Sequence, residues 1–343
     1  MVLRIAINGF GRIGRMVLRA GLTNPNIEFV ACNDLTNKET LAYLFKHDSV
    51  HKNFEGEVKI TDNGLLINKK ELFVFAKTNP QELPWKDLNI DVVIESTGRF
   101  KTRDELKKHL FAGAKKVIIT SPAKGDNVPT VVLGVNEHLI NFKDEEIISN
   151  ASCTTNCLAP LIKVLDDNYG LEKGFMTTIH SFTGDQNLVD GPHSDLRRGR
   201  SASTNIVPTS TGAAKSVGKV LTHLKGKLDG LAIRVPTVNG SITDLVCILK
   251  RPVTVDEVNT LFYQASHHHL KGIIEYNYDD IVSSDIIGNS HSTIFDPTLT
   301  FTQGTLLKIG AWYDNEWAYS CRIIDVLDII HSNLHQNNIT EEE

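Results

Sequence analysis

The chain is poor in cysteine, and its few cysteines show no pairing pattern. There are five, an odd number without the short spacings of a metal site: Cys32, Cys153, Cys157, Cys247 and Cys321. Scattered cysteines of this kind are typical of reduced thiols in a cytoplasmic protein rather than of a secreted disulfide framework. We therefore expect no structural disulfide, no metal site and a cytoplasmic location.

The sequence also lacks long apolar runs, internal repeats, low-complexity linkers and an excess of positive charge. No run approaches the length that spans a bilayer, and the first residues enter a strand-like run with no signal peptide before it. A formal net charge of −5 gives no electrostatic reason for binding nucleic acid or anionic membranes. At 343 residues, with 41% hydrophobic and 22% charged residues, the chain is typical of two closely joined globular domains.

A glycine-rich turn near the N-terminus has the spacing of a dinucleotide-binding loop. Gly9, Gly11 and Gly14 lie between a strand-like run over 3–8 and a helical pattern over 12–21. We expect Gly9 to form the tight turn, Gly11 to admit a pyrophosphate, and Gly14 to let helix and strand pack closely. The alternative is a glycine turn that merely joins two packed elements.

An acidic residue follows the next strand-like run, 27–33. It is Asp34, twenty residues after Gly14. A carboxylate at this place accepts hydrogen bonds from the adenosine ribose and repels a 2′-phosphate. The cofactor predicted from these residues is therefore NAD rather than NADP.

Strand-like and helical runs continue to alternate through the first 150 residues. Strands are expected at 91–96, 116–120, 130–134 and 146–149, and a helix at 103–112. This predicts an α/β domain over 1–150 with a Rossmann-type doubly wound parallel sheet, which binds ligands at the carboxyl ends of its strands. Thr97, Thr120 and Cys153 follow such ends, so we expect the cysteine to reach the cofactor's crevice.

The second half of the chain shows longer alternating runs and predicts an α+β catalytic domain over 151–315 with a mostly antiparallel sheet. Helical patterns at 212–224 and 254–269 separate strand-like runs at 174–182, 231–237, 241–250, 272–277 and 305–313. A last helix, about 317–333, lies within a C-terminal segment 316–343 that we expect to complete the first domain. The polar loop 183–205 is long enough to be functional or interfacial.

The stretch around Cys153 indicates a reactive thiol. It follows a strand-like run and leads into a helical pattern, and a cysteine at a helix N-terminus can have a lowered pKa. The hydroxyls of Ser152 and Thr154 beside it suit a phosphate or an oxyanion. The alternative is a buried structural cysteine before an ordinary helix cap.

Partners for such a thiol can be proposed from the second half of the chain. His180 ends a strand-like run and is the candidate base, although a histidine in this position is often structural. Anion contacts are expected from five further residues: Thr183, Arg198, Thr211, Gly212 and Arg234. Each alone also fits a helix cap or an ion pair, but together they predict two phosphate sites that flank one thiol.

Five segments resemble the phosphorylating, NAD-dependent glyceraldehyde-3-phosphate dehydrogenases of bacterial type. They are NGFGRIGR (8–15), SNASCTTNCLAP (149–160), TSTGAAK (209–215), RVPT (234–237) and WYDNEWAYS (312–320). Their order and spacing are those of the family, and the resemblance covers essentially the whole chain.

The resemblance implies roles for individual residues. Cys153 would be the nucleophile and His180 its base. Thr183 and Arg234 would hold the substrate phosphate with Arg198 nearby, while Ser152, Thr154, Thr211 and Gly212 would hold inorganic phosphate. Arg12, Ile13, Asp34, Thr97, Thr120 and Asn315 would contact NAD, as would Thr78, which stands where the family commonly has an arginine near the adenine.

The resemblance also implies a homotetramer that oxidises and phosphorylates glyceraldehyde 3-phosphate through a thiohemiacetal and a thioester on Cys153. The product would be 1,3-bisphosphoglycerate, in glycolysis and reversibly in gluconeogenesis. Two related activities are alternatives: an erythrose-4-phosphate dehydrogenase and an NADP-preferring gluconeogenic form. An NAD-binding adhesion or interaction module is the alternative from another class.

Overall fold

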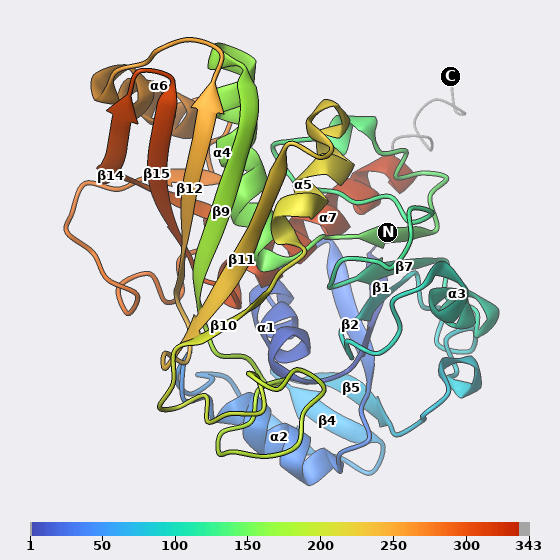
Figure 1. Ribbon diagram of the computed structural model, residues 1–343. Helices are drawn as coiled ribbons and strands as arrows, with labels where there is room; N and C mark the ends of the chain where they lie inside the picture. The colour runs from blue at the N-terminus through green and yellow to red at the C-terminus, as the bar shows by residue number, and fades with distance from the viewer. Residues whose placement is uncertain (1, 336–343) are drawn as a thin grey trace, which may run out of the picture. The chain divides into compact units, whose positions relative to one another are not determined.

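The computed structural model describes residues 2–335, and the C-terminal part of the predicted segment 316–343, from residue 336, lies outside the described residues. The chain divides into two compact units (Figure 1). The first comprises 1–131, 138–151 and 320–343, and the second 132–137 and 152–319. Both predicted sheets are present, so the predicted fold class is confirmed.

The first unit contains an eight-stranded sheet in the order β3-β4-β5-β2-β1-β6-β7-β8. Its strands are β1 (Leu3–Asn8), β2 (Ile27–Asn33), β3 (Val58–Ile60), β4 (Gly64–Ile67), β5 (Lys70–Phe75), β6 (Val92–Glu95), β7 (Lys116–Ile119) and β8 (Ile147–Ser149). From β5 to β8 all neighbours are parallel, whereas β3, β4 and β5 form an antiparallel meander. Strands β1, β2 and β6 are buried on both faces, and their sequences are almost continuously apolar. This is expected when helices cover both faces of a parallel sheet.

Helices α1 (Arg12–Gly21), α2 (Lys38–Lys46) and α3 (Arg103–Phe111) connect the strands of this unit, with a short 3₁₀ helix at Pro80–Glu82. A capping box begins α3, because the Thr102 hydroxyl accepts from Glu105 N–H and the Glu105 carboxylate accepts from Thr102 N–H. The expected strand over 130–134 is wrong. Only Thr130 bridges to Ser149, and residues 132–137, which include Gly134 at φ 80°, belong to the second unit.

The second unit contains a seven-stranded, mostly antiparallel sheet in the order β10-β11-β9-β12-β15-β14-β13. Its strands are β9 (Leu171–Ser181), β10 (Val207–Ser210), β11 (Leu228–Val235), β12 (Ser241–Leu249), β13 (Ile274–Tyr276), β14 (Thr293–Gln303) and β15 (Leu306–Tyr313). Strand β14 and the short β10 were not predicted. The sequence Asp296-Pro297 and a register shift interrupt the alternation in β14 and hide its strand pattern.

Helices α4 (Cys153–Tyr169), α5 (Ala213–Val220) and α6 (Val255–His267) pack on one face of this sheet. In Figure 1, α4 lies behind β9 and β12, and α6 lies near β14. Alternate residues of β9, including Met176, Thr178 and His180, are buried beneath these helices, while Phe175 on the opposite face is exposed. The sheet therefore presents His180 to the side on which α4 begins.

The last helix, α7 (Trp317–His335), starts in the second unit and passes into the first at Ser320. Within the first unit, the Asp328 carboxylate accepts hydrogen bonds from the amides of Asn24 and Asn26 at 2.9 and 2.8 Å. The side chain of Ile324 fills the space above Gly21 of α1.

Candidate active site

In the loop between β1 and α1, steric contacts with the backbone require glycine at two positions. Gly9 has φ +94°, and a Cβ on it would lie 2.6 Å from Thr97 N. A Cβ on Gly14 would lie 2.2 Å from the carbonyl oxygen of Gly9, so these two positions require glycine. Gly11 differs, because its φ is −72° and a Cβ there would meet nothing within 4 Å. The space in front of Gly11 is open for a ligand.

A cavity of about 260 Å³ lies at the carboxyl ends of β1, β2 and β6. Five predicted cofactor residues line it: Gly9, Gly11, Asp34, Thr78 and Thr97. The Asp34 carboxylate accepts from Phe10 N–H at 2.9 Å and from Thr36 N–H at 3.0 Å, which fixes its direction and leaves lone pairs for further donors. The cavity, the glycine turn and the Asp34 carboxylate together fit a dinucleotide: the turn can approach the pyrophosphate, and the carboxylate can accept hydrogen bonds from the adenosine ribose.

The other predicted cofactor residues do not line this cavity. In the first unit these are Arg12, Ile13, Gly14 and Thr120. Arg12 forms an ion pair with Asp48, and the Thr120 hydroxyl donates to the Glu95 carbonyl at 3.2 Å. Ile13 and Arg12 occupy the first turn of α1, whose N–H groups have no intrahelical acceptors and suit a phosphate.

Asn315 belongs to the second unit and is fixed by its amide oxygen. Three donors reach Oδ1: Ser241 Oγ at 2.9 Å, Ser181 Oγ at 3.0 Å and Gly240 N at 3.2 Å. The carboxamide cannot rotate without losing these bonds, so Nδ2 is held as a donor in one direction.

Gly14→Ala and Gly11→Ala form a matched pair of tests for the loop. Gly14→Ala is expected to lower both stability, by about 1–3 kcal/mol, and NAD affinity, because the new methyl overlaps backbone. Gly11→Ala should keep the melting temperature and lose NAD affinity only, because its methyl enters the open space. Thermal unfolding and calorimetric NAD titration separate the two. Equal loss of stability in both variants would contradict this assignment.

Cys153 and His180 lie in contact in the second unit. Ser152 caps α4 by accepting from Thr155 N–H at 3.1 Å, which places Cys153 at the first helical position. The Cys153 Sγ is 3.6 Å from His180 Nε2, and His180 Nδ1 is 2.7 Å from the Ser181 carbonyl oxygen. Because only an N–H can bond to that carbonyl, Nδ1 carries the proton and Nε2 faces the thiol as an acceptor.

Burial governs the protonation of this pair. It lowers the pKa of His180 to about 3, with Arg234 acting in the same direction, so the imidazole is neutral at pH 7. Burial also raises the pKa of the Cys153 thiol, although Arg234 and hydrogen bonds from Thr154 oppose this. The lowered pKa of Cys153 that is expected from the helix N-terminus is therefore not found. The thiol proton has a neutral acceptor in His180 Nε2.

Arg234 is placed beside His180 by strand register. The parallel pair β11 and β9 aligns Arg234 with His180, so both side chains leave neighbouring strands at one level. Arg234 Nη1 donates to Thr183 Oγ1 at 2.7 Å and to the Ser181 carbonyl at 3.3 Å. Its Nε is buried and finds no hydrogen-bond partner among the described residues. A partly buried guanidinium with an unused buried donor fits an anion that the protein itself does not supply.

Asp185 connects the two predicted arginines. Its carboxylate accepts from the Thr183 hydroxyl and, at 2.8 Å, from Arg198 Nη1. Burial acts to raise the pKa of Asp185, but Thr183, Arg234 and Arg198 outweigh it and leave the pKa lowered. Arg198 also donates from Nε to Thr209 Oγ1 at 3.0 Å and from Nη2 to the Ser210 carbonyl at 3.3 Å. Of the five N–H groups of Arg198, one thus bonds within the loop 183–205 and two join the loop to strand β10.

The predicted hydroxyl contacts near Cys153 are turned inward. The Thr154 hydroxyl is buried against the Tyr313 hydroxyl at 2.8 Å, and Tyr313 reaches Thr178 Oγ1 at 2.8 Å on its other side. The Ser152 hydroxyl bonds to Thr155. Burial keeps the pKa of Tyr313 well above its usual value, so its hydroxyl stays protonated. These side chains fix the start of α4 under His180, whose ring meets Tyr313 edge-on.

Thr211 and Gly212 form a second, open helix start. Gly212 precedes α5, is exposed, and has no atom within 4 Å of a Cβ built on it. Thr211 Oγ1 accepts from Ala213 N–H at 3.2 Å. The N-cap residue Gly212 supplies no capping side chain, so the N–H groups of the first turn other than that of Ala213 suit an anion.

Several residues at these sites were not predicted. Asn8, Asn33, Leu35, Lys77, Ser96, Arg99 and Phe100 line the cavity of the first unit. Gln186, Asp185 and Tyr313 support Arg234, Thr183 and Thr154 in the second unit. Asn8 and Asn33 could have been predicted from their position at the ends of two buried strands, because a buried polar residue usually has a structural or functional role.

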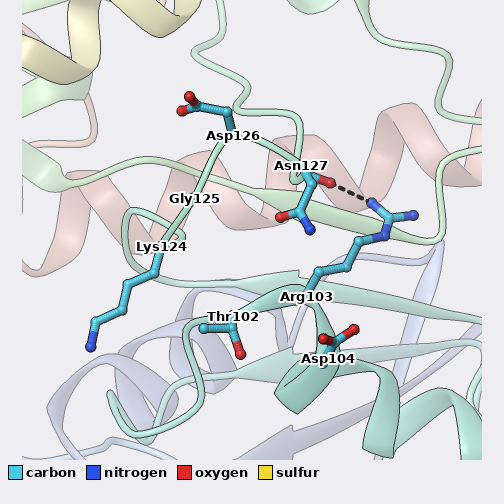
Figure 2. A pocket seen from close by; sticks show the side chains of 7 residues that line it. All are labelled: Thr102, Arg103, Asp104, Lys124, Gly125, Asp126 and Asn127. Atoms are coloured by element: carbon cyan, nitrogen blue, oxygen red, sulfur yellow. Dashed lines mark hydrogen bonds between the residues drawn. The ribbon is translucent and has the colours of Figure 1, made fainter.

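Another hollow of the first unit is shallow and lies away from the glycine loop. Figure 2 shows its lining residues, which include Thr102, Arg103, Lys124 and Asp126, with side chains that diverge rather than converge. The one hydrogen bond drawn joins Arg103 Nη1 to the Asn127 carbonyl at 2.8 Å. The hollow has a volume of about 560 Å³, but its lining side chains do not converge into a catalytic arrangement.

Within residues 2–335, no cluster of histidine, cysteine and acidic residues has the arrangement of a metal site. Within the same range no helix combines the length and the apolar character needed to cross a membrane. None of the five cysteines, which all lie within this range, forms a disulfide.

Comparison with known proteins identifies the family. Residues 3–103 match the family model for the glyceraldehyde 3-phosphate dehydrogenase NAD binding domain, and residues 152–315 match that for the C-terminal domain. The glyceraldehyde-3-phosphate dehydrogenase of Thermotoga maritima is 55% identical over 330 residues, which is 95% of this chain and 98% of the relative. That of Geobacillus stearothermophilus is 51% identical over 333 residues, 97% of this chain and 99% of the relative. The chain belongs to the glyceraldehyde-3-phosphate dehydrogenase family, as an enzyme with NAD as its cofactor.

Proposed function

We propose that the chain oxidises D-glyceraldehyde 3-phosphate with NAD and inorganic phosphate to 1,3-bisphosphoglycerate, as a cytoplasmic enzyme of glycolysis that runs in reverse in gluconeogenesis. The observation that carries the proposal is the contact of Cys153 Sγ with His180 Nε2 at 3.6 Å, beside an arginine with an unused buried donor. A free nucleophilic thiol agrees with a reducing compartment.

The reaction begins with addition of Cys153 to the aldehyde carbon. The thiol proton passes to His180 Nε2, which is unprotonated because Nδ1–H is held by the Ser181 carbonyl. The new C–S bond leaves an oxyanion on the former aldehyde oxygen. The protonated Nε2 and the Cys153 N–H, in the first turn of α4, are its proposed donors.

The substrate phosphate is proposed to bind Arg234 and Thr183. The Arg234 Nε and Nη2 groups are not used by the described residues, and a phosphate offers them a bidentate partner. Thr183 now donates to Asp185, and rotation of this hydroxyl would redirect it to the phosphate. Arg198 lies on the other side of Asp185 and adds positive charge.

Oxidation of the thiohemiacetal gives a thioester on Cys153. The oxyanion first takes the Nε2 proton of His180 and becomes the thiohemiacetal hydroxyl. His180 Nε2 takes this proton back as the hydride leaves the substrate carbon, and bound NAD would serve as the hydride acceptor. Inorganic phosphate then attacks the thioester carbonyl and Cys153 leaves as thiolate. We assign this phosphate to the start of α5, where Thr211 and Gly212 precede the helix, together with the start of α4. In that role Ser152 and Thr154 act through their backbone, and Ser152 also through the cap that it forms on α4.

NADH formation from glyceraldehyde 3-phosphate, NAD and inorganic phosphate tests the proposed function. We expect turnover to require phosphate and to disappear in Cys153→Ala. Turnover that ignores phosphate would contradict the phosphorolytic step. A higher kcat/KM with erythrose 4-phosphate or with NADP would assign the enzyme to one of the two alternative activities, and NAD binding without any turnover would favour an interaction module.

Asp34→Ala is expected to change the cofactor preference. Loss of a carboxylate that meets the ribose hydroxyls should weaken NAD binding about 10- to 100-fold, and removal of its charge should improve relative use of NADP. The ratio of kcat/KM values for NAD and NADP measures the change. Asp34→Asn keeps one acceptor for Phe10 N–H and is the control for loop geometry. An unchanged ratio in both variants would contradict the role of Asp34.

We also propose that the chain forms a homotetramer in which the uncovered face of the second sheet is an interface. Phe175, Leu231, Val246 and Leu306 are exposed on this face, and Phe175 is aligned with Val246. A contiguous apolar sheet face is a common site of subunit contact. The exposed Leu188, Val189 and Leu196 in the loop 183–205 are further candidates for contacts between subunits.

Phe175→Asp tests this interface. A carboxylate placed on the apolar face should convert the tetramer into smaller species, because each contact would bury an unpaired charge. Light scattering coupled to size-exclusion chromatography gives the mass. Phe111→Asp is the control, since Phe111 is equally exposed but ends helix α3. A tetramer that survives Phe175→Asp would exclude this face.

A further inference from the structure

Glu95 is a buried carboxylate at the carboxyl end of β6, and its side chain is not part of the cavity lining. Its residue exposure is 1%. Oε1 accepts from Thr97 N–H at 2.9 Å and from the Thr97 hydroxyl. Oε2 lies 2.6 Å from Asn8 Nδ2 and 3.1 Å from His109 Nε2. Four polar groups from three elements therefore converge on one side chain.

Trp85 determines the protonation of the histidine in this cluster. Its indole N–H donates to His109 Nδ1 at 3.0 Å, and an indole nitrogen can only donate. His109 Nδ1 is therefore an acceptor, and Nε2 carries the proton that is donated to Glu95. The ring is neutral, since a proton on both nitrogens would face the Trp85 N–H. His109 and Trp85 are both fully buried, so water does not replace either contact.

All four partners of Glu95 are consequently donors. An ionised carboxylate satisfies them with its two oxygens, because it accepts and never donates. A glutamine of the same shape would turn an NH₂ group toward either Thr97 or the Asn8 and His109 pair, and two donors would then face each other in a dry interior. The site selects the charged acceptor, not merely a side chain of this size.

The residues that Glu95 holds form the wall of the cofactor cavity. Thr97 and Asn8 both line it. Gly9 packs directly on the Thr97 backbone, where a Cβ on Gly9 would lie 2.6 Å from Thr97 N. Asn8 Oδ1 accepts from Asn33 Nδ2 at 2.7 Å, and Asn33 Oδ1 accepts from Lys77 N–H at 2.8 Å, so the network continues to the far side of the same cavity.

We propose that Glu95 is a positioning residue for NAD: its carboxylate fixes Thr97 and Asn8, and through them the glycine turn, in the geometry that receives the cofactor. His109 and Trp85 hold the carboxylate in place from behind. The inference rests on NAD binding at this cavity. It requires no direct contact between Glu95 and the cofactor.

Glu95→Gln and Glu95→Asp separate an acceptor role from simple packing. Glutamine keeps the shape and replaces one acceptor by a donor, whereas aspartate keeps the acceptors and is one methylene shorter. We expect the NAD dissociation constant to rise at least about tenfold in Glu95→Gln and by a smaller factor, about two- to fivefold, in Glu95→Asp. An unchanged constant in Glu95→Gln, or weaker binding by Glu95→Asp than by Glu95→Gln, would overturn the proposal.

Asp296→Asn is the matched control in the second unit. Asp296 is also a buried carboxylate surrounded by donors, which are Thr298 N, the Thr298 hydroxyl and Trp312 Nε1. It should lose stability as Glu95→Gln does and keep its NAD affinity. If both variants lose the same stability and neither loses NAD affinity, Glu95 has a structural role only and the proposal fails.

Calorimetric NAD titration is used rather than turnover, so the result does not depend on the proposed reaction. The rate of Cys153 alkylation without cofactor should be unchanged in both Glu95 variants, which shows that the second unit is intact. In steady state the KM for NAD should rise while kcat at saturating NAD is retained. If Glu95→Gln yields no folded protein, Glu95→Asp gives the same measurement, and an unchanged NAD constant there overturns the proposal.

Discussion

Cys153→Ser is expected to lower kcat by at least about 10⁴-fold, the largest effect of any single change in the chain. A serine hydroxyl occupies nearly the same space at the start of α4 but is a far weaker nucleophile than a thiol, and His180 cannot compensate for this. The fold should be kept, because Ser152 rather than Cys153 caps the helix. Steady-state NADH formation and thermal unfolding measure the two quantities.

Cys157→Ser is the matched control for this prediction. Cys157 lies one helical turn further along α4 and is fully buried, and burial raises the pKa of its thiol to about 12. It is therefore inert, and its replacement should reduce stability while kcat stays within about threefold of the parent. Activity that is retained in Cys153→Ser, or lost equally in Cys157→Ser, would contradict the assignment of the nucleophile.

His180→Asn is expected to lower kcat by about 10²- to 10⁴-fold, the range associated with general acid–base catalysis. Asparagine has no group of suitable basicity to take the Cys153 proton. Alkylation of Cys153 by iodoacetamide at pH 7 should slow as well, because burial holds the thiol in its neutral form once the acceptor is gone. The pH at which alkylation reaches half its maximal rate should move upward.

His223→Asn is the control for a histidine in the same unit. His223 is exposed and forms an ion pair with Asp166 at 2.5 Å. It is remote from Cys153 in the sequence, and its ion pair does not involve Cys153. Its replacement should leave both kcat and the alkylation profile unchanged. An alkylation profile that is identical in His180→Asn and the parent would show that His180 is not the acceptor of the thiol proton.

Local sequence patterns predicted the features that depend on local geometry. The spacing of Gly9, Gly11 and Gly14 is a steric requirement of one turn, and the structure shows that requirement at Gly9 and Gly14. The place of Cys153 after a strand and at the start of a helix also depends only on residues adjacent in the chain, so the sequence could predict it. The βα alternation predicted the parallel sheet because each strand and its helix are contiguous in the chain.

Features that depend on distant residues could not be predicted in this way. The direction of the Thr154 hydroxyl is determined by Tyr313, and the pairing of Arg234 with His180 is determined by strand register. Residues 130–134 have the apolar composition of a strand but form a single bridge, from Thr130 to Ser149 of β8. The roles of the site residues remain proposals, supported by their geometry and tested by the substitutions above.

Single turnover without phosphate tests the covalent mechanism most directly. The enzyme is mixed with NAD and glyceraldehyde 3-phosphate in phosphate-free buffer, and NADH is followed while the protein is digested and analysed by mass spectrometry. We expect one NADH per active subunit in a burst and a 3-phosphoglyceroyl thioester on Cys153, which added phosphate releases. NADH formation without an adduct on Cys153, or an adduct on another residue, would contradict the mechanism.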